Sequence, residues 1–124
     1  MSPADGGRDP RGDFQGLPAE LIEQSIAEST LILPLEAALV AVRLRAEQGI
    51  RLESWEGWVR LPDGGRAKSL SHGGSFALPR DTAAAAGRAS DAMKHAQERW
   101  NRDPEYPNAT LFFGLTFARP EVPA

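Results

Sequence analysis

The sequence contains no cysteine and only two histidines, His72 and His95. The lack of cysteine excludes disulfide bonds, thiolate metal sites and a cysteine nucleophile. Neither histidine has a second histidine three or four residues away, which is the spacing of zinc-binding pairs. Isolated histidines of this kind are typical of surface or structural positions. We therefore predict no catalytic residues, no metal site and no cofactor.

Long apolar runs and an excess of basic residues are also missing. No run approaches the ~18 apolar residues of a membrane span, and residues 1–5 lack the basic and apolar regions of a secretory signal. Lys and Arg number 14 against 17 Asp and Glu, so the formal net charge is −3. Because phosphate-backbone binding needs clustered positive charge, nucleic acid is not expected as a partner. These features predict a cytoplasmic protein that binds neither membrane nor nucleic acid.

The composition also predicts the domain boundaries. Within residues 1–16, Phe14 is the only large apolar side chain. This small apolar surface cannot offset the entropy that is lost when the backbone is ordered. We therefore predict a disordered N-terminal tail over 1–16. Residues 17–118 are then one domain, and 119–124 form a C-terminal tail. A domain of about 100 residues buries roughly 60–70% of its unfolded surface, which suffices for a core without disulfides.

Helical spacing of apolar residues appears in three segments. It predicts helices over 18–29, 34–48 and 81–101, with an apolar connector at 31–33 between the first two. Arg45 falls outside the apolar stripe of the second helix. The predicted stripes are Leu35, Ala38, Leu39, Val42 and Ala46 in the second helix, and Ala86, Ala89, Met93, Ala96 and Trp100 in the third.

The remaining segments have the composition of strands. Residues 50–61 are rich in β-branched and aromatic side chains, and the sequence Pro-Asp-Gly-Gly after them predicts a hairpin turn. The return arm, 66–78, is interrupted by His-Gly-Gly-Ser at 72–75 and should be short, bulged or partly loop. Residues 109–118 alternate in polarity like a strand. The pattern predicts an α/β (α+β) fold, helix-helix-strand-strand-helix-strand, with a small mixed sheet of about three strands and three helices.

The first arm of the hairpin carries the most distinctive residues. Trp55 and Trp58 fall on opposite parities, so either the strand is buried on both faces or a bulge near Gly57 switches the alternation. One interpretation places both tryptophans in the core. The other leaves one tryptophan pointing away from the helices, where an aromatic side chain beside Glu53 and Glu56 resembles an interface hot spot. The candidate partner-binding residues are Glu53, Trp55, Glu56, Trp58, Asp63 and His72.

Several strings resemble a known family. Residues 20–26 (ELIEQSI), 33–39 (LPLEAAL) and 111–117 (LFFGLTF), with the long third helix, are similar to the immunity protein 40 family of bacterial polymorphic toxin systems. The resemblance covers residues 19–118 in outline. It implies an antitoxin that binds and occludes a co-encoded toxin, and it supplies no catalytic residues. The segment 53–57 replaces a Gly-rich acidic turn of that family, which leaves the identity of the toxin open. The oligomeric state is open as well.

Two other functions are also compatible with the sequence. A small enzyme or ligand-binding protein would place a pocket near His72, with Glu53, Asp63 or Ser75 contributing. An accessory subunit of a larger complex would use a binding surface much as an inhibitor does. A pocket that holds His72 beside a carboxylate would favour the enzyme, whereas an open acidic face with an exposed tryptophan would favour the inhibitor.

Overall fold

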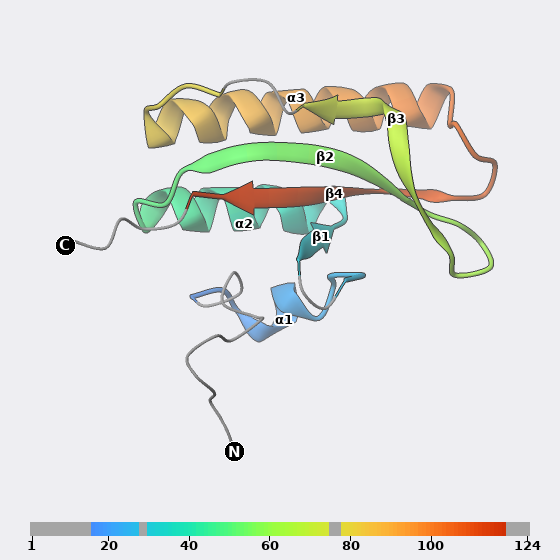
Figure 1. Ribbon diagram of the computed structural model, residues 1–124, viewed down its shortest axis with the longest axis horizontal. Coiled ribbons are helices and arrows are strands. Elements are labelled where there is room, and N and C mark those ends of the chain that lie inside the picture. The colour runs from blue at the N-terminus through green and yellow to red at the C-terminus, as the bar shows by residue number, and fades with distance from the viewer. Residues whose placement is uncertain (1–15, 28–29, 75–77, 119–124) are drawn as a thin grey trace, which may run out of the picture.

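A computed structural model describes residues 16–27, 30–74 and 78–118. Its elements are α1 (Ala19–Ile22), β1 (Leu31–Leu33), α2 (Leu35–Glu47), β2 (Leu52–Arg60), β3 (Arg66–Gly74), α3 (Thr82–Arg102) and β4 (Thr110–Phe117). The predicted fold class is confirmed, because three helices accompany one sheet (Figure 1). The predicted tails at 1–16 and 119–124 lie outside the described residues, apart from Gly16.

The sheet has four strands in the order β1-β4-β2-β3, and each neighbouring pair is antiparallel. The additional strand is β1, at the segment 31–33 that the sequence pattern presents as a connector. Because β1 and β2 both run antiparallel to β4, they are parallel to each other on either side of it. The same relation holds for β3 and β4 around β2. The chain therefore contains two split βαβ units, with α2 and α3 as their crossovers.

Helix α1 is much shorter than the predicted helix over 18–29. The Ser25 hydroxyl ends the helical region because it bonds locally to the backbone: its Oγ lies 2.8 Å from the Ala27 carbonyl oxygen and accepts a hydrogen bond from the Ile32 amide (3.0 Å). Such side-chain bonds compete with the helical ladder. The turn brings the Ile26 amide to the Ile32 carbonyl at 3.0 Å, so the segment after α1 lies beside β1.

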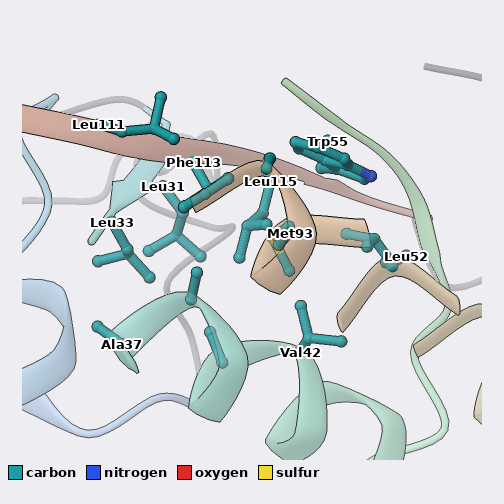
Figure 2. Packing of buried hydrophobic residues seen from close by; sticks show 14 of the residues in the cluster. Leu31, Leu33, Ala37, Val42, Leu52, Trp55, Met93, Leu111, Phe113 and Leu115 are labelled. Atoms are coloured by element: carbon teal, nitrogen blue, oxygen red, sulfur yellow. The ribbon is translucent and has the colours of Figure 1, made fainter. Parts of the chain in front are cut away.

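Helices α2 and α3 lie on one side of the sheet, behind β4 and β3 in Figure 1. Figure 2 shows Phe113 and Leu115 of β4 pointing toward Val42 of α2 and Met93 of α3. The side of α2 that faces the core differs in part from the predicted stripe. Its buried residues are Ala37, Ala38, Ala41, Val42 and Arg45.

Arg45 is buried, although the predicted apolar stripe of α2 excludes it. Its guanidinium donates to Gln48 Oε1 (3.0 Å) and lies 5.6 Å from the centre of the Phe117 ring, so the buried charge has partners. Gln48 in turn donates through Nε2 to the Gly16 carbonyl oxygen (2.9 Å). The end of α2 thereby holds the first described residue of the chain.

Helix α3 begins and packs largely as predicted. The Asp81 side chain caps it by accepting the Ala84 amide at 2.8 Å. The buried stripe contains Ala89 and Met93 as expected, but Ala85 replaces Ala86 at its start. Small side chains along this stripe let the helix approach the sheet closely.

We expect Ala89→Leu to lower the free energy of unfolding by about 1–3 kcal/mol, because Ala89 is fully buried and added methylenes would strain its neighbours. Urea denaturation followed by circular dichroism measures the change. Ala84→Leu, at an exposed position of the same helix, is the control and should stay within about 0.5 kcal/mol of the parent. Equal losses in both variants would show that the assigned face of α3 is wrong.

Strand β2 is irregular at two places. Leu52 pairs with Phe117 whereas Ser54 pairs with Thr116, so Glu53 is an extra residue that switches the alternation. The parity switch thus lies at Glu53 and not near Gly57 as one sequence interpretation had it. A separate shift in the pairing with β3 sets residues 69–72 opposite Gly57 alone.

The shift opposite Gly57 makes β3 bulged, as predicted for the return arm. His72 lies in this bulged stretch of a strand rather than in a loop. Ser69, which is buried at the start of the bulge, donates a hydrogen bond to the Glu105 carboxylate in the loop before β4. That bond ties the edge strand to the loop between α3 and β4.

Candidate protein-binding surface

One face of the sheet is not covered by α2 and α3. On β2, Trp55 and Val59 belong to the core on the helix side, so Glu56, Trp58 and Arg60 point to the other side. The strand register then identifies their neighbours on β3 and β4. We call this the open face, and its residues are Ser54, Glu56, Trp58, Arg60, Arg66, Lys68, Thr110, Phe112, Gly114 and Thr116.

Trp58 lies against the backbone of β4 on the open face. A Cβ atom added to Gly114 would come within 3.0 Å of Trp58 Nε1 and 3.1 Å of its Cδ1. Only the absence of a side chain at position 114 therefore leaves room for the indole ring. Phe112, the cross-strand neighbour of Trp58, is buried beside it. The half-buried indole is thus held in place while part of it remains accessible.

Charged residues surround Trp58. Lys68, directly opposite Trp58 on β3, forms an ion pair with Glu56 (Nζ to Oε2, 3.3 Å). Arg60 follows Trp58 on the same face of β2 and is paired with Arg66. Among the described side chains of the open face, the charges are three positive and one negative, 3 − 1 = +2, in a chain whose net charge is −3. The surface around the accessible tryptophan is therefore cationic, which is the opposite of the acidic face expected from the sequence.

Three of the predicted site residues have other places in the structure. Trp55 is only 4% exposed and contacts Phe113 in the core (ring centres 5.7 Å apart), so it has no surface to offer a partner. Glu53 is the bulge residue and lies 3.9 Å from the Arg51 guanidinium. Asp63 accepts the Gly65 amide at 2.8 Å and shapes the hairpin turn.

The remaining predicted residues are Glu56, Trp58 and His72. The structure brings Glu56 and Trp58 together on the open face. The side chain of His72 lies outside the part of the chain that the structure describes. The other histidine, His95, is exposed on α3 with Nδ1 4.0 Å from Glu98 Oε1.

Four residues of the open face are not among the predicted site residues: Arg60, Arg66, Lys68 and Gly114. Arg60 has the parity of Trp58, so the alternation in β2 could have placed it on the same face. For β3 and β4 the alternation alone was insufficient, because which residue lies beside Trp58 depends on the register between strands. The register places Gly114 beneath the indole and Arg66 opposite Arg60.

A hollow of about 560 Å³ opens at the turn end of the open face. Residues 23–26 after α1 form one wall, and the hairpin end forms the other. Arg66 Nη1 spans the gap by donating to the Ile26 carbonyl oxygen at 3.0 Å. The full lining is Glu23, Gln24, Ser25, Ile26, Pro34, Arg60, Gly64, Arg66 and Phe112.

A second hollow of about 640 Å³ lies on the opposite side of the molecule, between α2 and α3. Leu39 and Val40 from α2 and Ala83 and Ala86 from α3 give it an apolar floor. It carries no aromatic side chain in its lining. We treat it as the principal alternative surface for a partner.

Comparison of the chain with known protein families, curated proteins and solved structures found no match. The fold and surface define an α+β protein with an antiparallel sheet, helices on one face and a cationic, tryptophan-bearing surface on the other. None of the described helices is long and apolar enough to cross a membrane. Within the same residues, no three or more His, Cys, Asp or Glu side chains gather in the way that a metal site requires.

Proposed function

We propose that this chain is a non-enzymatic binding protein, an immunity protein that neutralises a cognate, co-encoded toxin through the open face of its sheet. The observation that carries the proposal is Trp58, an accessible indole held against Gly114 on the face that α2 and α3 leave uncovered. Tryptophan is enriched among the residues that dominate protein–protein affinity. In this proposal the protein acts in the cytoplasm of the cell that makes the toxin.

The surroundings of Trp58 support an interface. Hot-spot aromatics are rigid before binding and are ringed by polar groups that exclude water once the partner is seated. The Gly114 backbone beneath the indole provides rigidity, and the Lys68–Glu56 ion pair lies beside it. These features describe a preorganised contact surface. A partner can bind such a surface without the entropy cost of ordering its side chains.

The toxin-neutralising role rests on the resemblance of three sequence strings, 20–26, 33–39 and 111–117, to the immunity protein 40 family. In the structure these strings lie in α1 and the turn after it, at β1 and the start of α2, and in β4. They belong mainly to the scaffold, whereas Trp58 and its charged neighbours lie in the hairpin. The proposal therefore combines a scaffold resemblance with a separate surface argument.

The proposal is tested with the protein encoded by the reading frame next to the gene for this chain. That protein is expressed in a bacterial host alone and together with this chain, and growth is followed. We expect expression alone to arrest growth and co-expression to restore it, with the two proteins co-eluting in size-exclusion chromatography. Co-elution without any growth effect would point to an accessory subunit, and the absence of both would overturn the proposal.

A further inference from the structure

Arg60 and Arg66 form an unusual pair at the end of the hairpin. They are directly opposite each other on β2 and β3, and both side chains are exposed on the open face. Like charges at directly opposite positions destabilise a sheet. A sequence that keeps such a pair accepts a loss of stability, which is a common property of binding sites.

The two guanidinium groups line the same hollow beside the segment 23–26. Arg66 is oriented by its hydrogen bond from Nη1 to the Ile26 carbonyl oxygen, which uses one of the five N–H groups of its guanidinium. The side chain of Arg60 has no hydrogen-bond or ion-pair partner among the described residues. The site therefore presents two guanidinium groups at the edge of an open cavity, one oriented by a hydrogen bond and one without a partner in the part of the chain that the structure describes.

The charge balance of the hollow selects the ligand. Among the residues that the structure describes, its lining carries two positive charges, from Arg60 and Arg66, and one negative charge, from Glu23, so the sum is 2 − 1 = +1. A single carboxylate neutralises this charge, whereas a dianionic phosphate would exceed it and would lie near the Glu23 carboxylate. Paired N–H groups of guanidinium also match the geometry of a carboxylate.

We propose that Arg60 and Arg66 bind a carboxylate side chain of the partner protein, so that the partner docks an acidic segment along the open face beside Trp58. This inference rests on the proposed function for the identity of the partner. It adds the chemistry of the contact: the partner contributes an acidic residue at the hollow and an apolar group two positions along β2, at Trp58.

A peptide titration tests the carboxylate site without the natural partner. The side-chain Nε–Hε signals of Arg60 and Arg66 are followed by NMR while acetylated, amidated tetraglutamate is added to the full chain. We expect both signals to shift, and tetraglutamine to leave them in place. The double variant R60Q/R66Q should raise the dissociation constant for tetraglutamate about tenfold, the loss expected for charge-assisted hydrogen bonds.

The matched control is R80Q/R88Q, which changes the net charge equally at exposed positions just before α3 and on it. It should leave the tetraglutamate affinity unchanged, because it lies away from the hollow. Equal losses in both double variants would mean that net charge alone attracts the peptide and would overturn the site. Stronger shifts with inorganic phosphate than with tetraglutamate would overturn the carboxylate assignment in favour of a phosphoryl group.

The single variant R60Q adds a readout that a purely structural residue would not give. Removing one of two opposed charges should raise the melting temperature by about 1–4 °C, while it weakens tetraglutamate binding. If Arg60 were a purely structural residue, R60Q would lower both the melting temperature and the affinity for tetraglutamate, and that result would overturn the inference. R88Q, which removes an exposed charge on α3, controls for net charge in the melting experiment.

The titration and the partner experiment can fail separately. If the parent protein does not bind tetraglutamate but does form the toxin complex, the carboxylate site alone is overturned. Binding of tetraglutamate at Arg60 and Arg66, with no complex and no growth rescue, would support the carboxylate site and overturn the proposed function.

Discussion

Replacing Trp58 with alanine is expected to raise the dissociation constant of the toxin complex about thirtyfold or more, which corresponds to about 2 kcal/mol of binding free energy. The indole is the accessible aromatic group at the centre of the open face, and its position against Gly114 is fixed before the partner arrives. Its loss should act mainly on the dissociation rate, because truncation removes contacts that form after encounter. Surface plasmon resonance with the neighbour-encoded protein measures both rate constants.

The matched control for this variant is Tyr106→Ala. Tyr106 is a large side chain that is 37% exposed, in the loop between α3 and β4 and outside the open face. Its removal should leave the dissociation rate unchanged, and circular dichroism should show that both variants are folded. An unchanged affinity in folded Trp58→Ala would move the contact surface to the hollow between α2 and α3.

Local patterns predicted most elements of this fold. The polarity of residues 109–118 gave β4, and Asp81 with the alanine-rich stripe gave α3. The failures occurred where a tertiary contact outweighs a local preference. Residues 31–33 are too short to show alternation, and they are a strand only because β4 offers hydrogen-bonding partners. Helical spacing continued past Ile22, but the bonds of Ser25 to Ala27 and Ile32 replace the next helical turn.

The candidate surface was less predictable than the fold. Sequence parity placed Trp55 and Trp58 on opposite faces of a regular strand, but it could not say whether a bulge between them switches the alternation or which of them the helices would cover. The extra residue at Glu53 decides this, because it aligns Leu52 and Trp55 on the core side. The cationic character was hidden as well. It arises from Arg66 and Lys68 on β3, whose positions opposite Arg60 and Trp58 depend on register.

Trp55, the other tryptophan of the hairpin, is expected to affect the stability of the fold rather than the affinity for a partner. Trp55→Ala should lower the free energy of unfolding by about 3–5 kcal/mol, the range for buried aromatic residues truncated to alanine. Trp55 is 4% exposed, contacts the Phe113 ring at 5.7 Å between centres and pairs with Leu115 on β4. Figure 2 shows it near Leu115 and Met93, and all three belong to the buried core. Its removal would leave a cavity, because the surroundings of a truncated core residue relax only in part.

Urea denaturation measures the loss, with circular dichroism as the probe because the substitution removes a fluorophore. Small domains have a total stability of about 5–15 kcal/mol, so Trp55→Ala should bring this one close to its unfolding threshold. Trp55→Phe, which keeps an aromatic ring beside Phe113, should lose less than half as much. Trp58→Ala should lose under about 1 kcal/mol, since its ring is already partly in water. If Trp55→Ala proved as stable as Trp58→Ala, the two faces of β2 would be wrongly assigned, and the surface argument built on Trp58 would fail with them.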